Sequence, residues 1–102
     1  LNLPRVAAAV GFELDDLPPV PPIFGLIQRY GEVADAEMFE VFNMGVGFCV
    51  LAAPDDCDLI LAILRRHGRP ARVIGRVVAD RTKGVRLPRA GLTGHGKHFR
   101  RD

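Results

Sequence analysis

The spacing of apolar residues predicts two helices in the first half of the chain. Four prolines within residues 18–22 exclude regular structure there and make a stiff connector. Pro21 and Pro22 can begin a helix, because no amide donor is needed at a helix start, and Gly31 is a natural stop. A second, shorter helix is expected over residues 34–40. The apolar side chains of the first helix recur at helical spacing: Ile23, Phe24, Leu26, Ile27 and Tyr30.

The longest apolar run, residues 46–53, predicts a central strand covered on both faces. Pro54 ends this strand and begins a third helix, which we expect to end at Gly68. Residues 71–79 are rich in β-branched side chains and predict a strand, and residues 85–87 predict a short last strand that forms a hairpin with it. A strand is also favoured toward Phe12 and Leu14. The third helix should bury one face: Ile60, Leu61, Ile63 and Leu64.

This order of elements favours an α/β fold of the α+β type. Helices and sheets bury their apolar faces against one another, so we expect a layered sandwich in which helices cover a mixed sheet of four or more strands. A length of 102 residues favours one domain. We expect this domain to occupy residues 1–88. Residues 89–102 are basic, contain glycines and have little apolar content, so they should form a flexible tail.

The composition is that of an ordinary globular protein, with 48% hydrophobic and 25% charged residues. No apolar run approaches the roughly 18 residues that cross a membrane, and no signal-peptide pattern is visible. The first residue, Leu1, indicates a trimmed chain or a segment of a longer one. Cys49 and Cys57 do not make a disulfide framework. We expect two reduced, partly buried thiols in a cytoplasmic protein.

Charge is distributed unevenly along the chain. Residues 81–102 contain seven Lys/Arg and one acid, a net charge of +6, and the remainder carries −4. This end could attract nucleic acid, a phosphate ligand or an acidic partner, or could be only a solvated tail. Nucleic-acid binding is disfavoured, because Phe99 is the only aromatic residue among the basic ones. His95 and His98 have no obvious third ligand, so no metal site is predicted.

The segment from Asn43 to Gly47 is the best candidate for a binding site. Gly45 and Gly47 allow the backbone to approach another group closely, and free amides at such a junction can hold an anion. Asn43 can orient a ligand through both a donor and an acceptor. Glycines at a tight junction between helix and strand can equally be structural, so the pattern alone leaves both interpretations open.

Three motifs in order resemble one enzyme family. Residues 37–47 (EMFEVFNMGVG) closely resemble the E-M-[FY]-x-x-F-N-x-G-[VI]-G segment of aminoimidazole ribonucleotide synthetases, also called phosphoribosylformylglycinamidine cyclo-ligases. Residues 2–6 (NLPRV) resemble the family's E-N-[IL]-P-R-V segment. Ile74-Gly75 and Val77 match its later I-G-x-[VI] strand. The resemblance covers about residues 2–88, and residues 91–97 match no segment of the family.

The resemblance implies the C-terminal, substrate-side domain of an enzyme of de novo purine biosynthesis. Such an enzyme uses ATP and Mg²⁺ to convert formylglycinamidine ribonucleotide to aminoimidazole ribonucleotide. ATP and metal binding, and most of the dimer contact, belong to an N-terminal domain that this chain lacks. No G-x-x-x-x-G-K-[ST] loop is present. We expect the chain alone to be inactive and to supply no catalytic residue. Its expected substrate contacts in the interdomain cleft are Asn2, Arg5, Asn43, Gly45 and Gly47.

A second hypothesis is a stand-alone, non-catalytic ligand-binding or regulatory domain of the same fold. An ATP-binding domain encoded immediately upstream would favour the synthetase, and a start codon near Leu1 would favour the stand-alone domain. A third hypothesis is a nucleic-acid binder that works through the basic end, for which a salt-dependent affinity would be required.

Overall fold

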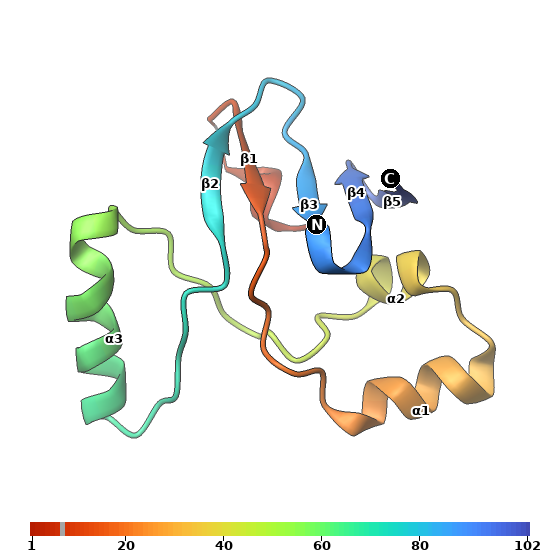
Figure 1. The fold of residues 1–102 in the computed structure, drawn as a ribbon, viewed down its shortest axis with the longest axis horizontal. Coiled ribbons are helices and arrows are strands. Elements are labelled where there is room, and N and C mark those ends of the chain that lie inside the picture. The colour runs from red at the N-terminus through yellow and green to blue at the C-terminus, as the bar shows by residue number, and fades with distance from the viewer. Residues whose placement is uncertain (7) are drawn as a thin grey trace.

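A computed structural model, which describes residues 1–6 and 8–102, contains a five-stranded sheet (Figure 1). The strand order is β2-β1-β3-β4-β5. β1 pairs antiparallel with β2 and parallel with β3, and the other pairs are antiparallel. The predicted mixed sheet in a layered α+β arrangement is therefore confirmed. The strand bounds are β1 Val10–Glu13, β2 Arg76–Ala79, β3 Val85–Leu87, β4 Leu92–His95 and β5 His98–Arg101.

The helices fall close to their expected places. α1 is Pro22–Gly31, α2 is Asp35–Val41 and α3 is Cys57–Arg66. α1 has Pro21 as its N-cap, as the prolines predict, but the left-handed residue that ends it is Glu32 (φ 52°). Three short 3₁₀ helices complete the described structure: η1 Leu3–Arg5, η2 Pro54–Asp56 and η3 Pro88–Ala90.

The hydrophobic core lies on one face of the sheet. Leu3 and Val6, at η1, pack against this core, as does Phe39 of α2. The rings of Phe39 and Phe99 meet edge to face with centroids 6.3 Å apart. The buried side chains at the centre come from four strands: Phe12, Val85, Leu87, Leu92 and Phe99. A strand alternates its faces, so Glu13 points to the opposite face.

That opposite face of the sheet is charged. The Arg76 guanidinium lies 2.5 Å from one carboxylate oxygen of Glu13, and the Arg86 guanidinium lies 3.4 Å from the other. Both arginines are exposed, so each pair is worth at most about 1 kcal/mol. The charges mark this face as the solvent side, whereas the other face carries the core.

Glu40 attaches α2 to the edge of the sheet. Its Oε1 accepts a hydrogen bond of 2.7 Å from the backbone amide of Phe99 in β5. β5 is an edge strand, and an unpaired amide at an edge can otherwise pair with another chain. Met38, also in α2, is fully buried. The helix that precedes Asn43 is therefore fixed firmly against the sheet.

The predicted central strand over residues 46–53 is wrong. This segment has no regular structure, and the side chain of Phe48 is 88% exposed. Both edges of β1 are already occupied, by β2 and β3, so no central position is open to it. The run is apolar as the sequence indicates, but no element among the described residues covers its solvent-facing side.

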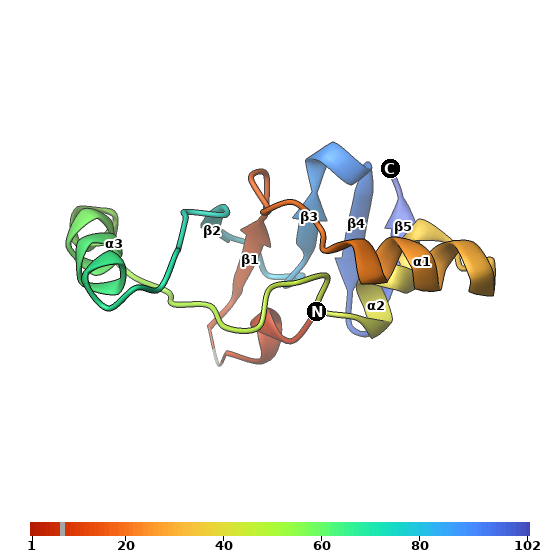
Figure 2. The same ribbon diagram turned by 90° about the horizontal axis from the view of Figure 1, so that it is seen from below.

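The apolar stripes of α1 and α3 are also not buried, contrary to expectation. No residue of either helix is fully buried. α3 stands away from the sheet on two irregular connections (Figures 1 and 2). In α1, Phe24 packs edge to face against Phe42 with ring centroids 5.8 Å apart, whereas Ile23, Leu26 and Tyr30 are exposed. An apolar stripe predicts a helix but does not supply the surface that it packs against.

The C-terminal part of the chain differs most from expectation. The predicted hairpin between residues 71–79 and 85–87 is wrong, because β1 lies between β2 and β3. Residues 89–102, expected as a flexible tail, contain β4 and β5. The side chains of Leu92 and Phe99 pack in the core, so two buried apolar residues attach this hairpin to the rest of the fold. A division of the chain at residue 88, and mobility beyond it, stay predictions.

Both cysteines are free thiols. Cys57 is half-buried, as expected, but Cys49 is exposed because the segment that carries it is not a buried strand. No helix in residues 1–6 and 8–102 has the length and apolar character needed to cross a membrane.

Candidate functional site

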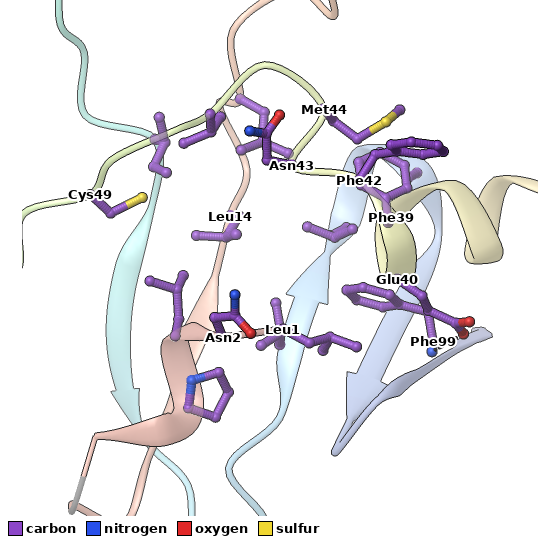
Figure 3. A pocket seen from close by; sticks show the side chains of 18 of the residues that line it. Leu1, Asn2, Leu14, Phe39, Glu40, Phe42, Asn43, Met44, Cys49 and Phe99 are labelled. Atoms are coloured by element: carbon purple, nitrogen blue, oxygen red, sulfur yellow. Dashed lines mark hydrogen bonds between the residues drawn. The ribbon is translucent and has the colours of Figure 1, made fainter. Parts of the chain in front are cut away.

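A broad groove of about 1830 Å³ lies on the core face of the sheet. Leu14, Val85 and Leu87 line its floor, residues 1–6 form one wall, and the segment of residues 39–51 passes over the other side. Figure 3 shows Asn2 and Asn43 on opposite sides of the groove with Leu14 between them. Small-molecule pockets measure about 300–1,000 Å³. The groove is therefore larger than one small ligand needs.

Four of the five predicted site residues line this one groove: Asn2, Arg5, Asn43 and Gly47. Two motifs that are some 40 positions apart in the sequence thus face the same space. Gly45 is not among the lining residues, although its two neighbours, Met44 and Val46, are. The structure brings the two motifs together as the resemblance implies; their contact with a substrate stays a prediction.

Asn43 begins a tight turn. Its side-chain Oδ1 accepts a hydrogen bond of 2.9 Å from the Gly45 amide, and its carbonyl accepts one of 3.0 Å from the Val46 amide. The two central residues of the turn, Met44 (φ 54°) and Gly45 (φ 97°), both have positive φ, as in a type I′ turn. The acceptor of Asn43 is thus used within the chain, and its exposed amide NH₂ is the part left to meet a ligand.

The two glycines of the motif have different roles. A Cβ on Gly45 would lie 2.6 Å from Cδ of Pro21, and its φ is positive, so a side chain there is unfavourable on both counts. The close approach expected at Gly45 is therefore made by a proline of the same chain. Gly47 is exposed, and a Cβ there would meet nothing within 4 Å. Gly47 is the glycine that leaves backbone open to a ligand.

Asn2 and Arg5 flank η1 on the other side of the groove. Asn2 stands at the N-cap position but makes no side-chain capping bond, and both side chains are exposed. Leu1, Leu3 and Val6 pack against the core and hold the segment on the sheet. The apolar residues of the motif thus anchor it, and its polar residues are free to face the groove.

Basic side chains outnumber acidic ones around the groove. Arg5, Lys83, Arg89 and Lys97 line it, against Asp15 and Glu40. Arg89 lies 3.7 Å from Asp16, and outside the groove Arg101 lies 4.0 Å from Asp35, so part of the basic end is paired within the chain. The excess of positive charge favours an anionic ligand. Sequence reasoning assigned no role to Lys83, because nothing local shows that its loop reaches η1.

No metal centre is assembled by the described residues. Among residues 1–6 and 8–102, no three His, Cys, Asp or Glu side chains lie close enough to hold a metal ion. His95 and His98 face each other across the β4–β5 pair without a third donor. The positive charge of the groove thus favours an anionic ligand, and the described part of the chain assembles no cluster of three metal ligands.

The family model for "AIR synthase related protein, C-terminal domain" matches residues 2–88. The chain belongs to this family. The matched range contains both motifs of the groove and extends through β3, and it leaves β4 and β5 outside. Membership of this family thus rests on most of the chain, including every residue predicted for the site.

Three curated relatives share one name, phosphoribosylformylglycinamidine cyclo-ligase. The chain is 47% identical to the protein of Methanococcus maripaludis (strain C6) over 76 residues, which are 74% of this chain and 22% of that protein. It is 49% identical to that of Methanothermobacter thermautotrophicus over 84% of this chain and 24% of the relative. It is 43% identical to that of Bacillus licheniformis over 90% of this chain and 27% of the relative. The chain spans about a quarter of the length of these relatives. No solved structure matches it significantly.

Proposed function

We propose that this chain is the substrate-side C-terminal domain of a phosphoribosylformylglycinamidine cyclo-ligase. The observation that carries the proposal is the single groove that Asn2, Arg5, Asn43 and Gly47 line together. The names of the relatives and the share of their length that is matched support it. In the proposed reaction, formylglycinamidine ribonucleotide is closed to aminoimidazole ribonucleotide.

The residues of this chain bind and orient the ribonucleotide. Arg5 presents a planar guanidinium, which suits a phosphate group because two of its donors can engage two oxygens at once. The free amide of Asn43 donates to a substrate carbonyl or hydroxyl, and the open backbone at Gly47 allows close approach. These groups hold the substrate in a reactive geometry, which is a contribution to rate in itself. We assign no proton transfer to any of them.

ATP and Mg²⁺ belong, in this proposal, to the part of the enzyme outside this chain. ATP supplies the phosphoryl group that activates the amide oxygen of the substrate. The described residues offer no carboxylate cluster for the metal, and the sequence contains no G-x-x-x-x-G-K-[ST] loop. In this proposal the described residues of this chain therefore hold the ribonucleotide and not the metal.

The partner that completes the site is the N-terminal, ATP-binding domain of the same enzyme. The groove is larger than a ribonucleotide requires, and three large apolar side chains of the segment beside it, Phe48, Val50 and Leu51, are exposed. A group of exposed apolar side chains is typical of a contact region. We further propose that the intact enzyme is a homodimer through that N-terminal domain and works in the cytoplasm.

Turnover assays test this assignment. We expect the purified chain neither to hydrolyse ATP nor to cyclise formylglycinamidine ribonucleotide, because it has no phosphate loop or metal-binding cluster among its described residues. The intact protein that carries the chain should do both. The measurement is ADP release and formation of aminoimidazole ribonucleotide. Robust ATP-dependent turnover by the 102-residue chain would contradict the assignment, as would an intact protein without cyclo-ligase activity.

A further inference from the structure

The loop between β2 and β3 reaches across the sheet to the motif that carries Arg5. The ammonium group of Lys83 donates a hydrogen bond of 2.8 Å to the carbonyl oxygen of Val6, at a partly buried position. Within residues 1–6 and 8–102, this is the one hydrogen bond that joins residues 2–6 to another part of the chain. The remaining attachment of the segment is apolar packing, which is not directional.

The backbone of Lys83 is in an unfavourable conformation. Its φ is 55°, in the left-handed region that side chains other than those of Gly, Asn and Asp rarely adopt. A glycine there would remove the strain, but it would also remove the ammonium group. Strained residues persist where the surrounding structure enforces them, and they concentrate at functional sites.

Asp80 is the residue that enforces the loop conformation. Its Oδ1 accepts hydrogen bonds from the hydroxyl and the amide of Thr82, at 2.7 and 2.8 Å, and its Oδ2 accepts one of 3.0 Å from the amide of Gly84. The Lys83 amide donates to the Asp80 carbonyl at 3.2 Å. These bonds, that of the Thr82 hydroxyl first, hold the pKa of Asp80 below its usual 3.8. Because the pKa is lowered, the ionised carboxylate stabilises the loop fully at pH values above 3.8. This stabilisation is lost as the pH falls through the lowered pKa.

The loop is also packed in place from both sides. The Thr82 hydroxyl donates to Asp80, so at 3.1 Å from Nε2 of His95 it can accept from that ring. A Cβ on Gly84 would lie 3.0 Å from His95 Nε2, and one on Gly11 would lie 2.8 Å from both Asp80 Oδ2 and the Gly84 carbonyl. The loop therefore has little freedom to move, and it presents Lys83 at a fixed point.

We propose that Lys83 is a positioning residue, which fixes the segment of Asn2 and Arg5 against the groove through its bond to Val6. The inference rests on the proposed function, because it assigns a purpose to the position of Arg5. Lys83 touches no reacting atom in this account. It acts by holding the Val6 carbonyl and, with it, the end of η1 from which Arg5 projects.

The test uses the intact protein with three substitutions. Each substitution is made singly. Lys83→Met keeps the length of the side chain without the donor, Lys83→Gly removes both the donor and the backbone strain, and Lys83→Arg keeps a charged donor at the end of the side chain. We expect Met and Gly to raise the KM for formylglycinamidine ribonucleotide on the order of tenfold, as for loss of a hydrogen bond to a charged group. The KM for ATP should not change in any variant. The KM of Lys83→Arg for formylglycinamidine ribonucleotide should stay close to that of the parent. Hydrogen–deuterium exchange should be faster in the Met variant in the peptide that contains residues 2–6.

The two measurements separate the possible failures. Unchanged exchange in Lys83→Met would overturn the tether itself, whether or not the protein is a cyclo-ligase. Faster exchange with an unchanged ribonucleotide KM would overturn the positioning role. If Lys83 has a purely structural role, the melting temperature of Lys83→Met should fall while its KM stays unchanged. Lys83→Gly, which is free of the backbone strain, should then match the parent in both melting temperature and KM. Faster exchange in an intact protein without ligase activity would contradict the proposed function and, with it, the assigned purpose.

Discussion

Replacement of Gly75 by alanine is expected to unfold the chain or to destabilise it by more than about 3 kcal/mol. A Cβ at Gly75 would overlap the carbonyl oxygen of Glu13 and lie 2.8 Å from both the Glu13 carbonyl carbon and Cα of Leu14. These are backbone atoms of β1 and its continuation, so they cannot turn away as a side chain could. Urea denaturation followed by circular dichroism measures the effect.

Gly25→Ala is the matched control for this substitution. Gly25 lies within α1, and a Cβ there would meet nothing within 4 Å. Alanine is the better helix former by about 1 kcal/mol, so this variant should be as stable as the parent or more stable. A Gly75→Ala variant within about 0.5 kcal/mol of the parent would show that β1 and the residues before β2 do not approach each other as closely as described.

Replacement of Asn43 by alanine is expected to lower substrate binding on the order of tenfold in the intact protein. Alanine removes the free amide that faces the groove, and it also removes the acceptor of the Gly45 amide. Loss of that turn bond should cost stability of about 1 kcal/mol as well. The KM for formylglycinamidine ribonucleotide and the melting temperature together report the two effects.

Asn43→Asp separates the two roles of the side chain. Aspartate keeps an oxygen acceptor for the Gly45 amide and tolerates the turn, but it has no amide donor. We expect the melting temperature of this variant to stay near that of the parent while KM rises at least as much as in Asn43→Ala, because a carboxylate also repels a phosphate. If KM is unchanged in both variants, Asn43 does not belong to the site.

Local signals in the sequence were sufficient for the helices and for part of the sheet. Prolines at 21 and 22 begin α1 as predicted, and Pro54 begins the short helix η2 that leads directly into α3. Strand pairing could not be obtained in this way. The parallel pairing of β1 with β3 joins residues more than 70 positions apart, and no turn residue specifies it. An adjacent hairpin was the simpler prediction, and it was wrong.

Burial was the property least accessible from the sequence. Most of the run of residues 46–53 is exposed, and the apolar stripe of α3 is at most half-buried, because burial depends on a second surface that the pattern does not contain. The reverse holds for β5, where a single Phe99 among basic residues reaches the core. The pattern of apolar residues thus predicted the type of secondary structure better than it predicted the burial of the side chains.

The members of the candidate site stay predictions from the motif resemblance, and its geometry could not be predicted from the sequence. The motif resemblance brought Arg5 and Asn43 to one site, and the groove contains both. The turn that uses the Asn43 acceptor, and the contact of Gly45 with Pro21, depend on packing between segments. Lys83 was not assigned, although an Asp followed by Thr at the second position and Gly at the fourth is a signal for a side-chain-capped turn.

Titration calorimetry with formylglycinamidine ribonucleotide distinguishes a shared substrate site from a self-sufficient one. In our proposal, this chain supplies one side of a substrate site that the rest of the enzyme completes. We predict no measurable heat of binding for the chain alone, and binding once the chain is combined with the N-terminal part of the enzyme or measured within the intact protein. Equal affinity for the chain alone and for the intact protein would contradict the claim, and it would identify a self-sufficient ligand-binding domain instead.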